Sequence, residues 1–363
     1  MGMDTRYGGG CMTQERNHGI DLLRLVLMFM VCVLHTLGHG GILNVCEAGS
    51  LNHKVYWFLE TLSYCAVDGF AIISGYMASD KPRKFEKLAD MWFQAFFYSL
   101  ILTLILTIAG LNANWGKLDV VKCVFPVTFG KFWYFTAYFA LFFAIPALNR
   151  FVFGIDETTA KKALMLLVVL YSFIGVVADP FKTQGGYSAL WLMILYCIGA
   201  LAKRVRLFEA RKSITLIVWW MGSILFSWAI LVIFKIGRLI NYVSPTVLFS
   251  AMIMVILFSR LKIKRTARII SKLSPLAFGI YLFQNNQVMW NVVMKDAFVF
   301  VAEQNIILGI ICVFVFALLI FISGLMVEFI RSKLAVCLRI PSLSRKIVHA
   351  ADILLGKLTV LLK

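Results

Sequence analysis

The chain has 363 residues, of which 61% are apolar and only 15% are charged, with 36 basic and 18 acidic side chains. Soluble domains average about 45–50% apolar and about 25% charged residues, so this composition excludes an ordinary soluble domain and indicates a membrane protein. The formal net charge of +18 would also suit a nucleic-acid-binding protein, because basic surfaces attract phosphates.

Ten stretches of the sequence have the composition of membrane-crossing helices, each of which needs about 20 mostly apolar residues. The longest runs are apolar on every face, which is typical of helices and not of the alternating strands of a membrane barrel. We therefore predict an all-α polytopic membrane protein with about ten transmembrane helices. The predicted spans are 20–38, 57–78, 91–110, 131–149, 162–178, 187–202, 214–234, 243–259, 274–293 and 304–330.

The basic residues alternate between the loops that join these spans. With a cytoplasmic N-terminus, 27 of the 36 basic residues lie in inner loops and tails, 8 lie in outer loops, and Arg24 lies inside the first span. Since Lys and Arg favour the cytoplasmic side, this distribution predicts that both termini are cytoplasmic. It also accounts for the net charge, so we expect no nucleic-acid partner.

Three segments follow from this topology. Residues 1–19 form a cytoplasmic N-terminal tail, 20–332 a ten-helix membrane domain, and 333–363 a cytoplasmic tail. Within that last tail, the apolar residues of 343–363 gather near one helical face and basic residues lie elsewhere. This pattern predicts an amphipathic helix on the inner leaflet, in contact with membrane lipids.

The first span contains three ionisable residues, Asp21, Arg24 and His35, and such residues usually line a cavity or pair with each other. Arg24 and His35 are eleven residues apart, so they face the same side of a helix at a separation of about 16 Å. We predict that both line one cavity, with Arg24 in its cytoplasmic half. The structural alternative is that Asp21 pairs with Arg24 and that His35 bonds to a neighbouring helix.

The second span runs inward and contains Glu60 and Asp68. Glu60 lies about 4.5 Å from the outer end, at the depth of His35, and Asp68 lies about 16 Å in, near the depth of Arg24. One hypothesis is that Glu60 orients or polarises His35 and that Asp68 pairs with Arg24 or lines the same cavity. The alternative for Glu60 is an interfacial position at a helix end.

His39 follows His35 by four residues, but no third ligand or HExxH pattern accompanies this pair. We therefore expect no metal site and interpret His39 as part of a flexible outer loop.

Five segments, in order, resemble the acyltransferase-3 family of integral membrane acyltransferases. GIDLLR at 19–24 with His35 matches the Arg-x10-His signature of that family, and AVDGFAIISGY at 66–76 matches its SGY segment. The stretch 125–149 resembles the members that O-acetylate bacterial surface polysaccharides, and 196–200 and 274–283 resemble later spans. Two departures stand out: Gln284 replaces a histidine of many members, and 90–93 lacks a basic R-x-x-R pattern.

The resemblance implies transfer of an acetyl group from cytoplasmic acetyl-CoA to a hydroxyl of a cell-envelope polysaccharide or lipid-linked glycan, in the bacterial cytoplasmic membrane. His35 would be the general base with Glu60, although a transient acetyl-histidine is the alternative. Arg24, a planar multidentate donor, would hold the coenzyme. Asp68 and the inner-loop residues Lys81, Arg83, Lys84 and Lys87 would complete the coenzyme site.

An oxyanion in this reaction needs neutral or positive donors. The candidates are Trp133, Tyr134, Tyr138, Gln284, Asn285 and Asn286. Trp133 and Tyr134 lie at the outer boundary, where an aromatic belt is the alternative, whereas the amides sit in the middle of a span, where they must meet a cavity or another helix.

A proton-coupled transporter or exporter of a glycan or small molecule is the alternative function, with His35, Glu60 and Asp68 relaying protons. Transporters often contain paired halves with helices broken at matching positions. The sequence shows no such pairing, and the two acids of this relay, Glu60 and Asp68, cluster in one span.

Overall fold

The computed structural model describes residues 16–79, 84–111 and 116–361, and every secondary-structure element in these ranges is helical. Six of the described helical stretches are long and apolar enough to cross a membrane. They are His18–Val45, Phe85–Ile108, Trp133–Gly154, Glu157–Ala178, Ser213–Phe234 and Ile306–Cys337. The prediction of an all-α, multi-pass membrane protein is confirmed.

Some of these stretches are single helices and others change helix type along their length. The single helices are α8 (Trp133–Gly154), α12 (Ser213–Phe234) and α16 (Ile306–Cys337). The composite stretches are α1 (His18–Leu34) with η1 (His35–His39) and α2 (Ile42–Val45), α5 (Phe85–Phe96) with η2 (Phe97–Leu102) and α6 (Thr103–Ile108), and α9 (Glu157–Val168) with η3 (Val169–Phe173) and α10 (Ile174–Ala178).

The other four predicted spans coincide with shorter or interrupted helices. These are α3 (Leu51–Ser63) with α4 (Ala66–Tyr76), α11 (Ala189–Arg204), α13 (Pro245–Ser259), and η6 (Ser274–Leu276) with α15 (Ala277–Gln284) and η7 (Met289–Met294). The remaining elements are α7 (Lys117–Val124), α14 (Ala267–Leu273), α17 (Ile340–Leu361), η4 (Gln184–Gly186), η5 (Gly237–Leu239) and η8 (Val299–Glu303). Ten crossings and cytoplasmic termini stay predictions, and "inner" and "outer" below refer to that predicted orientation.

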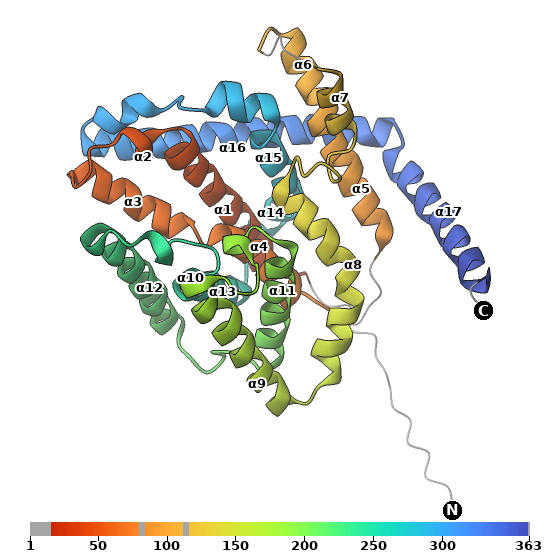
Figure 1. The fold of residues 1–363 in the computed structure, drawn as a ribbon, viewed down its shortest axis with the longest axis horizontal. Coiled ribbons are helices and arrows are strands. Elements are labelled where there is room, and N and C mark those ends of the chain that lie inside the picture. Colours follow the sequence, from red (N-terminus) through yellow and green to blue (C-terminus); the bar gives the residue numbers. More distant parts are fainter. Residues whose placement is uncertain (1–15, 80–83, 112–115, 362–363) are drawn as a thin grey trace, which may run out of the picture.

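Helix α4 lies in the middle of the bundle, against α1, α11 and α13 (Figure 1). Two glycines allow α4 and α11 to approach closely. A Cβ atom on Gly75 would collide with the carbonyl oxygen of Tyr196, and one on Gly199 would collide with that of Ile72. Small residues of this kind let the backbones of membrane helices pack directly together, so α4 and α11 form a tight pair behind the site described below.

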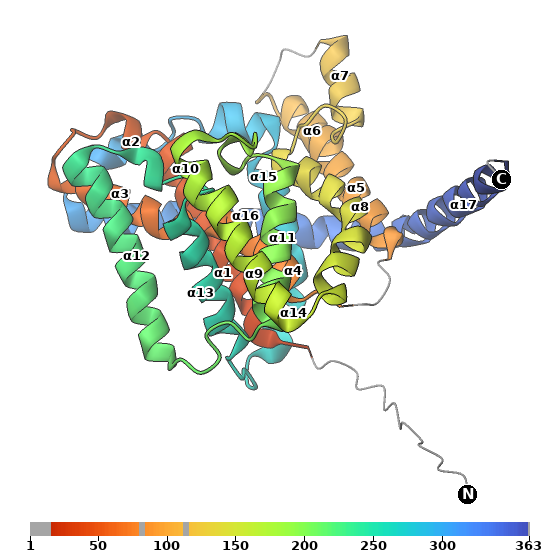
Figure 2. The same ribbon diagram turned by 60° about the horizontal axis from the view of Figure 1, so that its bottom comes forward.

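The C-terminal helix α17 projects from the bundle (Figures 1 and 2) and contacts α5 and α16. Ser344 donates a hydrogen bond of 2.6 Å to the Asp90 carboxylate, which joins α17 to α5. Ile347, Ile353 and Leu354 are exposed apolar residues of α17, and its attachment to the inner leaflet stays a prediction. Since α16 continues to Cys337, the predicted domain boundary at residue 332 falls within one helix.

Candidate active site

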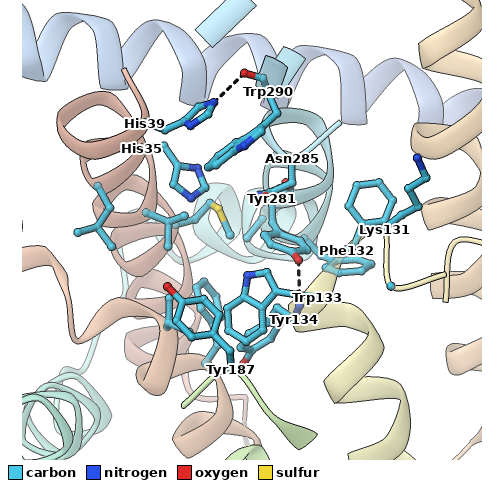
Figure 3. Close-up of a pocket in the computed structure, with 18 of the residues that line it drawn as sticks. His35, His39, Lys131, Phe132, Trp133, Tyr134, Tyr187, Tyr281, Asn285 and Trp290 are labelled. Carbon is cyan, nitrogen blue, oxygen red and sulfur yellow. Dashed lines mark hydrogen bonds between the residues drawn. The ribbon is translucent and has the colours of Figure 1, made fainter. Parts of the chain in front are cut away.

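A cavity of about 1130 Å³ lies between α1, α3, α4, α8 and the interrupted helix formed by η6, α15 and η7 (Figure 3). Arg24 and Ser274 line its inner part, and His35, His39 and Lys131 line its outer part. Arg24 and His35 are separated by about 16 Å along α1, which is about half the thickness of the hydrocarbon core of a bilayer. The cavity therefore extends over about this length of α1.

Helix α1 changes to a π-helix at His35. The backbone N–H of Gly40 donates to the carbonyl of His35 at 2.8 Å, five residues back, and Gly41 then ends the turn with a left-handed φ of 89°. Single π-turns inside helices are rare and often mark functional sites. His39 belongs to this turn, so its interpretation as part of a flexible loop is wrong, and both imidazoles face the same wall of the cavity (Figure 3).

Gln284, the last residue of α15, forms a hydrogen bond with the His35 ring. Nδ1 of His35 lies 2.9 Å from Oε1 of Gln284, and an amide oxygen only accepts hydrogen bonds, so Nδ1 is the donor. In the neutral imidazole, Nε2 then carries the lone pair. The Gln284 side chain is fully buried, and its Nε2 contacts the sulfur of Met28 at 3.6 Å. No described residue hydrogen-bonds Nε2 of His35, which leaves this basic nitrogen for a ligand.

Trp290 supports the same histidine from a second side. Its indole meets the His35 ring edge-on, with centroids 4.7 Å apart, and stacks on His39 at 3.6 Å. Nε2 of His39 donates to the Trp290 carbonyl at 2.7 Å. The sequence analysis missed Trp290, whose only signal is an aromatic residue three positions after the polar run 284–287.

Glu60 lines the cavity from α3 but is not the partner of His35. Its side chain is buried, and its Oε2 has no hydrogen-bond partner among the described residues. Its Oε1 lies 3.8 Å from the position that a Cβ would take on Gly38, one turn beyond His35. The hypothesis that Glu60 orients His35 directly therefore needs correction: Nδ1 faces Gln284, and Glu60 is an unpaired carboxyl group in the same cavity.

At the inner end, Asp21 and Arg24 form an ion pair. Nη1 of Arg24 lies 2.8 Å from Oδ1 of Asp21, and this oxygen also accepts from the Ser274 hydroxyl at 3.3 Å. The Asp21 side chain is buried, and its Oδ2 accepts from Nε of Arg16 at 2.5 Å. The pairing of Asp21 with Arg24 agrees with the structural alternative. The remaining guanidinium nitrogens of Arg24 have no hydrogen bonds to described residues, so Arg24 is anchored at one nitrogen and open to the cavity at the others.

Asp68 lies behind the cavity wall. It is fully buried, and Nε1 of Trp191 in α11 donates to its Oδ1 at 3.1 Å. The expectation that Asp68 pairs with Arg24 or lines the cavity is wrong, because Asp21 occupies Arg24 and the Asp68 side chain faces α11. Asp68 and Arg24 were predicted to lie at similar depths in the membrane, but they have different partners in the structure.

Aromatic side chains form the outer wall of the cavity. The ring of Trp133 lies 4.6 Å from that of Tyr187 and 6.3 Å from that of Tyr242. The backbone N–H of Tyr134 donates to the hydroxyl of Tyr281 at 3.1 Å, whereas the Tyr134 hydroxyl is buried without a partner among the described residues. Sequence analysis identified Trp133 and Tyr134 but missed Tyr187, Tyr242 and Tyr281, which come from distant segments.

The polar run 284–287 divides into different roles. Asn285 and Gln287 line the cavity, whereas Gln284 holds His35. Asn286 is fully buried and faces away: it donates to the Tyr98 carbonyl and the Thr103 hydroxyl, each at 2.7 Å, and accepts from the backbone at the start of η7. Asn286 therefore stabilises the helix break, and its assignment as an oxyanion donor is corrected.

Two further described candidates, Tyr138 and Lys84, are not among the residues that line the cavity. Tyr138 packs half-buried against the core, one turn beyond Tyr134, and is not among the described lining residues. Lys84 is exposed immediately before α5. Lys81 and Arg83 lie outside the described residues.

One known family matches most of the chain. A family model described as an acyltransferase domain, of the acyltransferase-3 family, matches residues 17–326, from the start of α1 into α16. Searches of curated proteins and of solved structures gave no match.

Proposed function

Because the chain belongs to the acyltransferase-3 family and is a membrane acyltransferase, we propose that it transfers an acetyl group from cytoplasmic acetyl-CoA to a hydroxyl of a cell-envelope polysaccharide or lipid-linked glycan. The proposal places it in the bacterial cytoplasmic membrane. The observation that carries it is the hydrogen bond between His35 and Gln284, in a cavity that Arg24 also lines.

His35 is the general base in this proposal. The acceptor hydroxyl gives its proton to Nε2 while its oxygen attacks the thioester carbonyl carbon, forming a C–O bond and a tetrahedral oxyanion. Collapse of this intermediate breaks the C–S bond, and the imidazolium returns the proton to the departing sulfur. Gln284 supports the step by keeping the proton of the resting ring on Nδ1.

Arg24 binds the donor from the inner side. Its open guanidinium nitrogens fit a carbonyl or phosphate oxygen of the coenzyme, and Asp21 fixes the orientation of the group through Nη1. Apolar side chains such as Met28 and Phe278 line the cavity beyond Arg24 and suit the slender pantetheine arm. The nucleotide end would remain near the predicted inner basic loops, which include Lys84.

Three side chains that line the cavity are suited to stabilise the charges of this reaction. The Tyr134 hydroxyl is an unpaired buried donor, and the side-chain amide of Asn285 has a second N–H beside the one bonded to Tyr281. Either donor would stabilise the negative oxygen as it forms. Glu60 would stabilise the positive charge that develops on the imidazole of His35, or accept a hydrogen bond from the acceptor.

Labelled acetyl-CoA tests the proposal. Membranes containing the wild-type protein should transfer label from acetyl-CoA to envelope polysaccharide, and membranes containing His35→Ala should lose this transfer by about 100-fold or more. Lys54→Met, a change at an exposed residue outside the described cavity, is the control and should transfer at the wild-type rate. Equal labelling by wild type and His35→Ala would refute the mechanism, and proton-driven efflux without transfer would favour the transporter.

A further inference from the structure

The outer part of the cavity is positively charged. Lys122 and Lys131 both line it, from α7 and from the residue preceding the N-terminal cap of α8. Among the described lining residues, the only carboxyl group is that of Glu60. A cavity that receives a glycan needs hydroxyl-binding groups, but a neutral glycan gives no reason for two ammonium groups.

Of these two lysines, Lys131 is the one without a carboxylate neighbour among the described residues. Its Nζ donates to Oε1 of Gln287 at 2.5 Å, and no carboxylate of a described residue lies within 4.0 Å of it. Lys122 has a carboxylate neighbour, since its Nζ lies 3.6 Å from Oδ1 of Asp119, and both of these side chains are more than one-third exposed. Lys131 is thus held in place by a neutral amide, with its charge uncompensated by the described residues.

Lys131 is also close to the catalytic group through the interrupted helix. Its partner Gln287 follows Gln284, the partner of His35, by three residues. Lys131 and His35 line the same cavity, so an anionic group bound by Lys131 would belong to the glycan whose hydroxyl reaches His35.

On the basis of the proposed function, we propose that the acceptor is an anionic glycan, with a carboxylate or phosphate oxyanion bound by Lys131 and assisted by Lys122. The coenzyme phosphates do not account for these lysines, because the donor binds near Arg24, at the other end of the cavity. A lysine binds either oxyanion as a compact point charge. The aromatic wall formed by Trp133, Tyr187 and Tyr242 then faces the sugar rings.

The test uses label transfer from acetyl-CoA to the envelope polysaccharide of the cells that produce the protein. Labelled product from wild-type membranes should bind to an anion exchanger. Chemical reduction of carboxyl groups should abolish binding of the product to the exchanger if the anion is a carboxylate. Treatment with hydrofluoric acid should abolish this binding if the anion is a phosphate. Labelled polysaccharide that is neutral before treatment would overturn the inference while leaving the proposed acetyl transfer intact.

Substitutions of Lys131 provide a second test of the inference. Lys131→Met should lower kcat/KM for the acceptor by about 10- to 100-fold, the effect of losing a hydrogen bond to a charged group, with the KM for acetyl-CoA unchanged. Lys131→Arg should restore most of the activity, because it keeps the charge. Lys54→Met is the matched control. Equal losses in Lys131→Met and Lys131→Arg would refute a charge-based role, and no label in any sample would instead refute the proposed function.

Discussion

His35 and Gln284 are 249 positions apart and share a hydrogen bond of 2.9 Å from Nδ1 to Oε1. Each residue lies where a helix loses its regular geometry. His35 opens the π-turn η1, and Gln284 is the last residue of α15 before the break that leads to η7. A neutral amide in this place fixes the tautomer of the imidazole without placing a second charge in the buried wall.

This hydrogen bond predicts that one substitution of Gln284 lowers activity and that another retains it. Gln284→Leu removes the acceptor and leaves the Nδ1–H of His35 unpaired, so acetyl transfer should fall by about 10- to 100-fold. Gln284→Glu keeps an acceptor oxygen and should retain substantial activity. Single-turnover transfer of labelled acetyl groups measures both rates, and wild-type activity in Gln284→Leu would show that the amide has no orienting role.

Glu60 predicts a change in pH dependence. The carboxyl group is buried, unpaired at Oε2 and inside the cavity, so Glu60→Gln removes an ionisable group with little change in shape. We expect kcat to fall by about tenfold or more, as for loss of a charge-assisted hydrogen bond, and the pH–activity profile to change shape. Thr61→Val is the control, because the neighbouring buried Thr61 hydroxyl donates to the Trp57 carbonyl at 2.7 Å and does not line the described cavity. An unchanged rate and profile in Glu60→Gln would remove Glu60 from the mechanism.

The spacing of Arg24 and His35 was sufficient to place both on one cavity wall, because the intervening residues form a regular α-helix. The partners of these residues were not predictable in the same way. Depth in the membrane suggested Asp68 for Arg24, but depth does not specify which way a side chain points around the helix, and Asp68 faces Trp191.

The amide run shows a second limit of sequence reasoning. Four adjacent amides cover all sides of a regular helix, so composition alone could not separate a structural Asn286 from a cavity-lining Asn285. The separation comes from the break after Gln284, where Asn286 turns towards Tyr98 and Thr103. The amides themselves stabilise this break, through the backbone bonds that Asn286 accepts from Val288 and Met289.

Arg24 predicts a selective effect on the donor. Arg24→Lys preserves the charge and a contact with Asp21 but removes the planar set of donors that faces the cavity. The KM for acetyl-CoA should rise about tenfold, the loss expected for about one hydrogen bond to a charged group, whereas the KM for the acceptor should not change. Initial rates with each substrate varied in turn measure this difference. A larger effect on the acceptor than on acetyl-CoA would contradict the assignment of Arg24 to the donor half of the cavity.

The contact between α4 and α11 gives a prediction about stability. In Gly75→Ala the new methyl group would meet the carbonyl oxygen of Tyr196, and overpacking of this kind costs about 1–3 kcal/mol. Gly222→Ala is the matched control, because Gly222 lies inside α12 with no neighbouring atom within 4 Å of the new methyl group, and alanine favours a helix by up to about 1 kcal/mol over glycine. Thermal unfolding in detergent should therefore give a lower Tm for Gly75→Ala and an equal or higher Tm for Gly222→Ala. Equal Tm values for Gly75→Ala and the wild type would mean that α4 and α11 can separate without cost, and the wall behind the cavity would then not be the tight pair described above.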